Sequence, residues 1–364
     1  MNKEPLIIYF TLTKACNLAC LHCVRSHTPN NHYNDEIQTM GTNDAIKVIK
    51  QLGDFYPNAT LAITGGEPTL HPDFDTIAQE SCLCFKNIVL TTNGIFPEHK
   101  LKRLAELTQN PNFYIQVSLD GDEVSHDEIR GKGTYNKTIK SIIELCNLCR
   151  NNSISISTTV SKLNMKSMFN LAENLKHIPF HKWRLAPEQI FDSNQFARHI
   201  SSSEWNNFVD EILKVCFFKV SIKKVFDFTL MEKSLEDTTK NRILRTNCGF
   251  GKYKMYIYPD FSVIPCTCMP HLVIGNILKD NIEDIDKRIN SCQPVCSKDS
   301  VCNTCKFYPV CKGGCVGYSY YYQGKIGMGD IRCPKSKHSK KCTFYTLRFG
   351  CSFAAVNTIK PQLL

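Results

Sequence analysis

The strongest constraint on the fold is a regular alternation that runs from the start of the chain to about residue 187. Short runs of β-branched residues are separated there by longer stretches with helical spacing. Strands that alternate with helices are typical of βα units, which build parallel sheets. The predicted strands span residues 6–13, 60–64, 87–92, 113–119, 153–160 and 182–186. Six such units predict an α/β fold with an open, partial (β/α)6 barrel of the TIM type, because a closed ring needs eight.

Local signals refine the helices between these strands. Thr42 is a predicted N-cap for the helix before the second strand. Pro97 is a predicted first-turn residue of the helix after the third. The clearest helical pattern places four apolar residues on one buried face, namely Ile139, Ile142, Ile143 and Cys146.

The strand-helix rhythm stops after residue 187, which predicts three regions. Residues 1–187 form the barrel, and residues 188–247 form a mostly helical, polar connector with an amphipathic stretch at 205–218. Residues 248–364 are rich in cysteine, glycine and aromatic residues and end in a basic tail. Because this last region has little aliphatic core, we expect bound metal to supply much of its stability.

Twenty cysteines in 364 residues indicate metal binding. The start of the chain lacks the basic lead and cleavage site of a signal peptide, and no apolar run approaches the ~18 residues of a membrane span. We therefore expect a cytoplasmic protein without a membrane partner, whose thiols stay reduced. The net charge of +10 suits an acidic partner but selects none, and a nucleic acid is not an expected partner.

Three cysteines follow the first predicted strand with CxxxCxxC spacing, namely Cys16, Cys20 and Cys23. Three thiolates on one tight loop can bind three irons of a cubic 4Fe-4S cluster and leave the fourth iron without a protein ligand. Structural zinc sites use paired CxxC spacing and four ligands, so zinc fits this loop poorly.

This loop resembles the cluster-binding loop of the radical S-adenosylmethionine (SAM) superfamily, and four further stretches are similar to motifs of that family. They are GGEP at 65–68, TTNG at 91–94, VSLDG at 117–121 and the segment at 126–135. The resemblance implies that backbone groups and the Glu67 carboxylate hold the SAM amino group, that Ser118 and Asp120 approach the ribose, and that Arg130 pairs with the SAM carboxylate. His22, before the last cluster cysteine, is expected at the adenine. The full set of implied cofactor-binding residues is His22, Gly65, Gly66, Glu67, Pro68, Asn93, Ser118, Asp120 and Arg130.

The resemblance also implies the chemistry. SAM chelates the open iron, an electron enters through the cluster, and the sulfonium bond breaks to leave methionine and a 5'-deoxyadenosyl radical. That radical abstracts a hydrogen atom from an unactivated carbon.

A second group of cysteines lies in the last region. A Cx2Cx5Cx3C quartet comprises Cys302, Cys305, Cys311 and Cys315, with Cys248 and Cys266 upstream and Cys333 downstream. From the residues alone, such a quartet could bind zinc or an iron-sulfur cluster, and seven ordered cysteines need more than one site.

This arrangement resembles the SPASM extension of radical SAM enzymes, which carries two auxiliary 4Fe-4S clusters. By that resemblance Cys248, Cys266 and Cys315 serve an inner cluster, while Cys302, Cys305, Cys311 and Cys333 serve an outer one. The first candidate for a fourth inner ligand is Cys268, followed by Cys296 or Cys292; an open iron that binds substrate is the alternative. Phe261 stands where the family usually has glycine, so we expect the nearby hairpin turn to be built differently.

SPASM relatives act mainly on peptides, so the resemblance implies a maturase of a ribosomally made precursor peptide. The radical would remove a side-chain hydrogen, most often from a Cβ, and a carbon-carbon, thioether or ether crosslink would form while the auxiliary clusters accept the second electron. An external donor such as flavodoxin or ferredoxin is expected to reduce the enzyme. The first strand starts almost at Met1, so we expect the peptide leader to be held by the barrel rim, by the basic run at 335–341 or by a separate protein.

Three alternatives remain from the sequence. A sulfatase maturase, which makes formylglycine, commonly has an aspartate after the second SPASM cysteine, and here the residue is Thr267. Haem or quinone cofactor maturation would act on small anionic substrates. A non-catalytic metal-binding scaffold would not need the GGEP and SLDG stretches.

Overall fold

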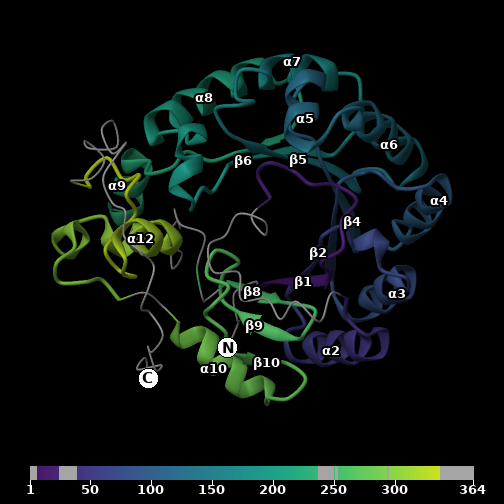
Figure 1. Cartoon of the computed structure of the whole chain (residues 1–364), viewed down its shortest axis with the longest axis horizontal. Helices are drawn as coiled ribbons and strands as arrows, with labels where there is room; N and C mark the ends of the chain where they lie inside the picture. Colours follow the sequence, from purple (N-terminus) through teal and green to yellow (C-terminus); the bar gives the residue numbers. More distant parts are fainter. Residues whose placement is uncertain (1–5, 24–38, 237–249, 251–252, 293–294, 337–364) are drawn as a thin grey trace.

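A computed structural model describes residues 6–23, 39–236, 250, 253–292 and 295–336. Its centre is one sheet of ten strands in the order β10-β9-β8-β1-β2-β3-β4-β5-β6-β7. Helices α2 to α8 lie in an arc around the outside of this sheet, and the C-terminal elements lie on the open side of the arc (Figure 1). The predicted mixed α/β fold with an open parallel barrel is therefore confirmed.

The six predicted barrel strands all form, and each of their ends lies within one residue of the predicted end. They are β1 Ile7–Thr13, β2 Thr60–Gly65, β3 Asn87–Thr92, β4 Phe113–Ser118, β5 Ile154–Val160 and β6 Lys182–Pro187. Every neighbouring pair from β1 to β6 is parallel. Parallel neighbours place all six carboxyl ends at one edge, where barrels of this kind carry their chemistry.

The helices that return between these strands cover the sheet with apolar stripes. They are α2 Thr42–Phe55, η1 Pro68–Leu70, α3 Phe74–Cys84, α4 Glu98–Leu107, α5 Glu123–Arg130, α6 Thr134–Leu148 and α7 Met168–Leu175. In α2, the residues with the i, i+3, i+4, i+7 spacing of one face are all buried, namely Ala45, Val48, Ile49 and Leu52. They share one core with Ile8, Phe10 and Leu12, which alternate along β1.

Three local predictions for these helices were wrong. Gly41 is the N-cap of α2, and Thr42 is its first residue, where the hydroxyl donates to Asp73 at 2.5 Å. Pro97 is the N-cap of α4 and precedes its first turn. In α6, Ile143 is 41% exposed, because the buried face is turned toward Ile142 and Leu145.

Segments from beyond residue 187 extend the sheet at both edges. Strand β7 (Val220–Ser221) pairs with β6, while β8 (Lys254–Ile257) pairs in parallel with β1. Strand β9 (Ser262–Ile264) forms a hairpin with β8, and β10 (Gly275–Asn276) pairs with β9. The ring of Tyr256 in β8 stacks on Tyr9 in β1 at 4.5 Å. The C-terminal region is thus joined to the first barrel strand. The division of the chain into three separate regions remains a prediction.

The remaining helices lie in the connector and the cysteine-rich region. They are η2 Ser193–Arg198, α8 Ser202–Val215, α9 Phe228–Glu236, α10 Ile282–Ser291, η3 Val301–Thr304, α11 Tyr308–Cys311 and α12 Val316–Gln323. Helix α8 starts with a capping box between Ser201 and Glu204 and buries Trp205 and Phe208, as its amphipathic pattern predicts. Among the helices of the described residues, none has both the length and the apolar character that crossing a membrane requires.

The turn between β8 and β9 holds Phe261 in a left-handed conformation. Its φ is 63°, its amide donates to the Tyr258 carbonyl at 2.8 Å, and its side chain is 6% exposed. The turn therefore uses the conformation that suits glycine and also buries a ring. A non-glycine residue in this region costs about 1–2 kcal/mol, and loss of a buried phenylalanine ring costs about 3–5 kcal/mol.

Phe261→Gly is therefore expected to be destabilised less than Phe261→Ala, by about 1 kcal/mol, because only glycine relieves the backbone strain. Urea unfolding of the two variants measures the difference. The matched pair Phe113→Gly and Phe113→Ala, in the extended strand β4, should show the opposite order. The same order at both positions would contradict the strain at Phe261.

Candidate active site

The loop with Cys16, Cys20 and Cys23 lies at the carboxyl end of β1. Cys16 is exposed and the other two are half-buried. The Cys23 amide donates to the Cys20 carbonyl at 3.1 Å, and the Leu21 amide donates to the Ile129 carbonyl at 2.9 Å. Burial raises the pKa of the Cys20 thiol, while the Arg130 guanidinium opposes this, and Cys23 and Cys16 also act on it electrostatically. The three thiols thus share one short turn at the barrel edge.

The glycine pair after β2 lies directly against the start of this loop. The Gly66 amide donates to the Thr13 carbonyl at 2.7 Å, and the Glu67 amide donates to the Ala15 carbonyl at 2.8 Å. A Cβ on Gly66 would lie 1.8 Å from the Ala15 oxygen, and one on Gly65 would lie 2.4 Å from the Thr13 oxygen. Only glycine permits this approach, so the pair fixes the path of the chain into the cysteine loop.

The Glu67 carboxylate points into the protein and is 0% exposed. One oxygen accepts from the Thr69 amide, the Thr69 hydroxyl and the Thr92 hydroxyl, and the other accepts from the Asn93 amide at 2.8 Å. Pro68, the first residue of η1, is buried beside it. In this arrangement Glu67 joins the GGEP turn to the end of β3.

Asn93 extends the hydrogen-bond network around Glu67 to the cysteine loop. Its side-chain amide donates to Asn17 Oδ1 at 2.7 Å, and Asn17 Nδ2 donates to the Ile95 carbonyl at 2.9 Å. The GGEP turn, the TTNG turn and the cysteine loop are therefore one hydrogen-bonded unit. Asn17 was missed by sequence reasoning, although its place between two of the cysteines was a signal.

A buried carboxylate lies under the same loop. Asp120 is 0% exposed, and its Oδ2 accepts from His22 Nε2 at 2.6 Å and from Arg130 Nε at 2.5 Å, while Oδ1 accepts from the Thr159 amide at 2.7 Å. Arg130 Nη1 lies 3.9 Å from the Cys20 sulfur. Burial would raise the pKa of Asp120, but the charges of Arg130 and His22 outweigh it and hold the pKa well below its usual range. Asp120 therefore orients the two residues that flank Cys20, and half-buried Ser118 ends β4 two residues earlier.

Asp120→Asn is expected to destabilise the apoprotein by about 2 kcal/mol, because charge-assisted hydrogen bonds are lost. A carboxyl whose folded pKa is depressed stabilises the fold above its unfolded pKa of about 3.9 and loses that effect as the pH falls toward the folded pKa. The difference in the free energy of unfolding between wild type and variant should thus be largest at pH 5 to 8 and decrease below about pH 4. Urea unfolding across this range measures it, with exposed Asp54→Asn as the control. A difference that is unchanged at low pH would contradict the charged network.

One further buried ion pair was not predicted from the sequence. Glu188, just after β6, is 7% exposed, and its Oε1 accepts from Arg198 Nη2 at 2.7 Å. Arg198 Nη1 donates to the Leu21 carbonyl in the cysteine loop at 3.1 Å. Within the described residues, Glu188 Oε2 has no hydrogen-bond partner. The pair joins the connector to the cysteine loop, and no sequence pattern marks two charges ten residues apart as partners.

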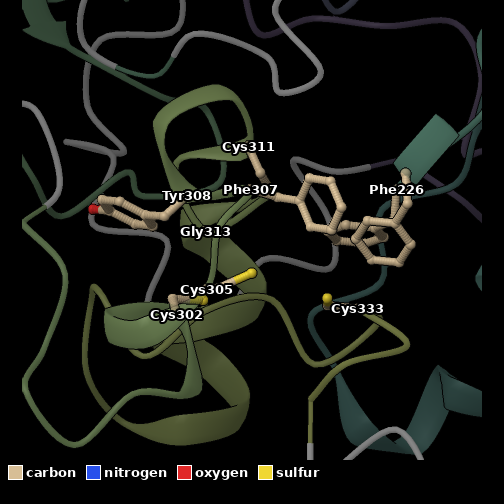
Figure 2. Close-up of a pocket in the computed structure, with 9 residues that line it drawn as sticks. Phe226, Cys302, Cys305, Phe307, Tyr308, Cys311, Gly313 and Cys333 are labelled. Carbon is tan, nitrogen blue, oxygen red and sulfur yellow. The ribbon is translucent and has the colours of Figure 1, made fainter. Parts of the chain in front are cut away.

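Four cysteines of the C-terminal region line one small pocket. They are Cys302, Cys305, Cys311 and Cys333, with the rings of Phe226 and Phe307 on one side (Figure 2). A Cβ on Gly329 would lie 2.6 Å from the Cys302 sulfur, so a larger residue there would push into the cysteine group. The structure thus brings together the four residues that the resemblance assigns to the outer cluster.

The arrangement of this group is compatible with a 4Fe-4S cubane. Each thiolate of a cubane binds a different iron, so its sulfurs surround a volume. Four sulfurs around an apolar cavity fit the cluster.

A second group lies around Cys266. Cys266 and Cys268 are buried in one apolar cluster, against which Cys292 and Cys315 also pack. The Cys268 amide lies 3.4 Å from the Cys266 sulfur, and the hydrogen bond from Cys268 lowers the pKa of the Cys266 thiol. Cys296 instead interacts with Cys302 and Cys305. Cys248 and most of the basic run at 335–341 lie outside the described residues.

The comparisons with known proteins address the same segments. The Radical SAM superfamily profile matches residues 10–175, which include the cysteine loop, the GGEP turn and the TTNG turn. The chain carries a radical SAM domain. It is therefore an enzyme of the radical SAM type, and such a domain binds SAM and a 4Fe-4S cluster.

Relatives of this radical SAM enzyme match over nearly its whole length. It is 24% identical over 339 residues to mycofactocin maturase MftC of Mycobacterium tuberculosis, covering 90% of this chain and 83% of that protein. It is 25% identical over 345 residues to AdoMet-dependent heme synthase of Methanosarcina barkeri, covering 89% and 95%. Among solved structures, Streptococcus suis SuiB bound to precursor peptide SuiA superposes with a TM-score of 0.71 at 16% identity, covering 91% of this chain and 76% of that one. The last likeness supports the fold alone.

Proposed function

We propose that this radical SAM enzyme is a maturase that installs an oxidative crosslink in a ribosomally made precursor peptide. The observation that carries the proposal is the similarity to mycofactocin maturase MftC, which covers 90% of this chain. A solved structure with the same fold holds a precursor peptide, which supports a peptide as the substrate.

We assign the SAM-binding cluster to Cys16, Cys20 and Cys23. The loop lies at the carboxyl edge of the barrel, and Gly65 and Gly66 hold it at a distance that a side chain would block. When bound, the cluster and SAM supply a 5'-deoxyadenosyl radical that removes a hydrogen atom from an unactivated carbon.

The polar residues around this loop divide into two proposed roles. Glu67 and Asp120 have both carboxylate oxygens bonded inside the protein, so we assign them to positioning. Through these hydrogen bonds, Glu67 orients the rest of the GGEP turn, and Asp120 orients His22 and Arg130. We assign the contacts with SAM to Gly65, Gly66 and Pro68 of that turn, to His22 and Arg130, and to Ser118 and Asn93.

We assign an outer auxiliary cluster to Cys302, Cys305, Cys311 and Cys333, and an inner one to Cys248, Cys266, Cys268 and Cys315. The cavity that the outer four share supports the first assignment. The common packing of Cys266, Cys268 and Cys315 supports the second. Two such clusters would take up the electron released when the crosslink closes, while an acceptor on the enzyme or in water takes the proton.

Two partners complete the proposal. A flavodoxin or ferredoxin is assigned as the external electron donor, because the cluster must be reduced before each cleavage. The peptide leader is assigned to the barrel rim, the basic run or a separate protein.

The test is incubation of the anaerobically reconstituted enzyme with SAM, a reductant and a synthetic copy of a short peptide encoded beside its gene. Mass spectrometry should show a peptide that has lost two hydrogens, and fragmentation should show a linked pair of residues. Conversion of a residue to an aldehyde would instead support formylglycine formation. Sulfatase maturases commonly carry an aspartate at the position of Thr267, and Thr267 offers no carboxylate.

Tetrapyrrole modification is the second candidate function. It is favoured by the similarity to a haem synthase, which is about as extensive as the similarity to the peptide maturase. Incubation with iron-coproporphyrin under the same conditions separates the two candidates. Turnover of the tetrapyrrole and not of the peptide would overturn the proposed maturase.

A further inference from the structure

Tyr321 carries a buried hydroxyl without a partner among the described residues, and its side chain packs against the apolar cluster that contains Cys266 and Cys268. Within the described residues, its oxygen is covered by protein and makes no hydrogen bond. An unmade hydrogen bond on a buried hydroxyl costs about 1–3 kcal/mol, so such a group needs an explanation.

The packing of α12 places this ring beside Cys268. Tyr321 lies one turn after Gly317 on the same helix face. A Cβ on Gly317 would lie 2.6 Å from the Phe191 ring and 3.3 Å from Cys268 Cβ. The Tyr321 ring itself contacts Phe191 at 5.1 Å and Tyr320 at 5.2 Å between centroids. These contacts pack the ring into the same cluster as Cys266 and Cys268.

The protonation state of the Tyr321 hydroxyl suits a hydrogen-bond donor. Burial raises the pKa of the Tyr321 hydroxyl above its ordinary value of about 10. The hydroxyl therefore keeps its proton and is available as a donor. The same packed cluster contains Cys266 and Cys268, and thiolate sulfurs accept such bonds when they are ligands of a cluster.

We propose that the Tyr321 hydroxyl donates a hydrogen bond to sulfur of the iron-sulfur cluster that Cys266 and Cys268 hold, and thereby raises its reduction potential. This rests on the proposed inner cluster. A hydrogen bond to sulfur stabilises the reduced, more negative state more than the oxidised one. Tyr321 is thus a positioning residue that makes this cluster a better acceptor of the electron released by the substrate.

The experiment compares Tyr321→Phe with wild type by redox titration monitored by electron paramagnetic resonance. Both proteins carry Cys16→Ala, Cys20→Ala and Cys23→Ala, so that the first cluster does not overlap the signal. At the wild-type midpoint of the inner couple, the ratio of reduced to oxidised cluster in the variant should be about tenfold lower, which is a shift of about 59 mV to more negative potential for one electron. Tyr320→Phe removes a hydroxyl from the neighbouring ring and should leave both couples in place.

A second measurement uses only the protein with Cys16→Ala, Cys20→Ala and Cys23→Ala and an intact Tyr321, so it does not depend on the folding of a Tyr321 variant. Pulsed resonance in H₂O and D₂O should show one exchangeable proton coupled to the reduced inner cluster. Three results would overturn the role of Tyr321 without overturning the proposed inner cluster. They are an unchanged reduction potential in Tyr321→Phe, an equal shift of the potential in Tyr320→Phe, and the absence of an exchangeable proton coupled to the reduced cluster. Iron analysis that finds a single auxiliary cluster in wild type would instead overturn the proposed cluster content, and the role of Tyr321 with it.

Discussion

Replacing Cys16, Cys20 and Cys23 together by alanine is expected to abolish formation of 5'-deoxyadenosine from SAM while the protein remains folded. The three thiols lie on one turn at the barrel edge, and the backbone bonds, glycine contacts and side-chain bonds of Asn17 and His22 that hold this turn are left in place by the substitutions. Chromatography of SAM incubated with dithionite and the reconstituted protein measures the product. The expected loss is at least 10³-fold, because the uncatalysed cleavage has no other source of electrons at the sulfonium.

Iron analysis separates this result from general damage. The triple variant should lose about one 4Fe-4S cluster and keep the iron held by the C-terminal cysteines. A matched variant, Cys82→Ala with Cys84→Ala on helix α3, should keep its activity. Continued SAM cleavage in the triple variant would contradict the assignment of the loop.

Gly66→Ala is expected to reduce SAM cleavage by about 10²-fold, since a displacement of about 1 Å at a reacting centre has that effect. The new Cβ would lie 1.8 Å from the Ala15 carbonyl oxygen, and backbone cannot move aside as a flexible side chain can. The GGEP turn and the cysteine loop must therefore separate. Overpacking of this kind also destabilises by about 1–3 kcal/mol.

Gly41→Ala is the control for this variant. Gly41 precedes α2 with an ordinary φ of −69°, and a Cβ there would meet no atom closer than 3.8 Å. It should keep full activity. Equal activity in Gly66→Ala and wild type would show that the close approach of the two loops has no role in cofactor binding.

Much of the fold could be predicted because the barrel strands can be recognised from their local sequence pattern. The strand β1, with Ile8, Phe10 and Leu12 on one face, needs no partner to be recognised. The errors came where tertiary packing decides. Ile143 has the spacing of a buried residue, yet the face of α6 is set by what β4, β5 and neighbouring helices offer, and Ile143 points to solvent.

The candidate site could be predicted only in part, for a related reason. Motif spacing located the cysteine loop and the GGEP turn, because these are local in sequence. The pairing of Asp120 with both His22 and Arg130, and of Glu188 with Arg198, depends on which strand ends meet, and spacing does not encode it. The same holds for Tyr321, whose place in a run of tyrosines suggests packing until its hydroxyl is seen to lack a partner.

The central claim is that the three-cysteine loop holds a cluster that binds SAM at an open iron. The most direct measurement is the electron paramagnetic resonance spectrum of the reduced, anaerobically prepared protein with and without SAM. The account predicts a cluster signal whose g-values change on addition of SAM in wild type and not in the triple cysteine variant. A wild-type spectrum that contains a cluster signal and is unaltered by saturating SAM would contradict it.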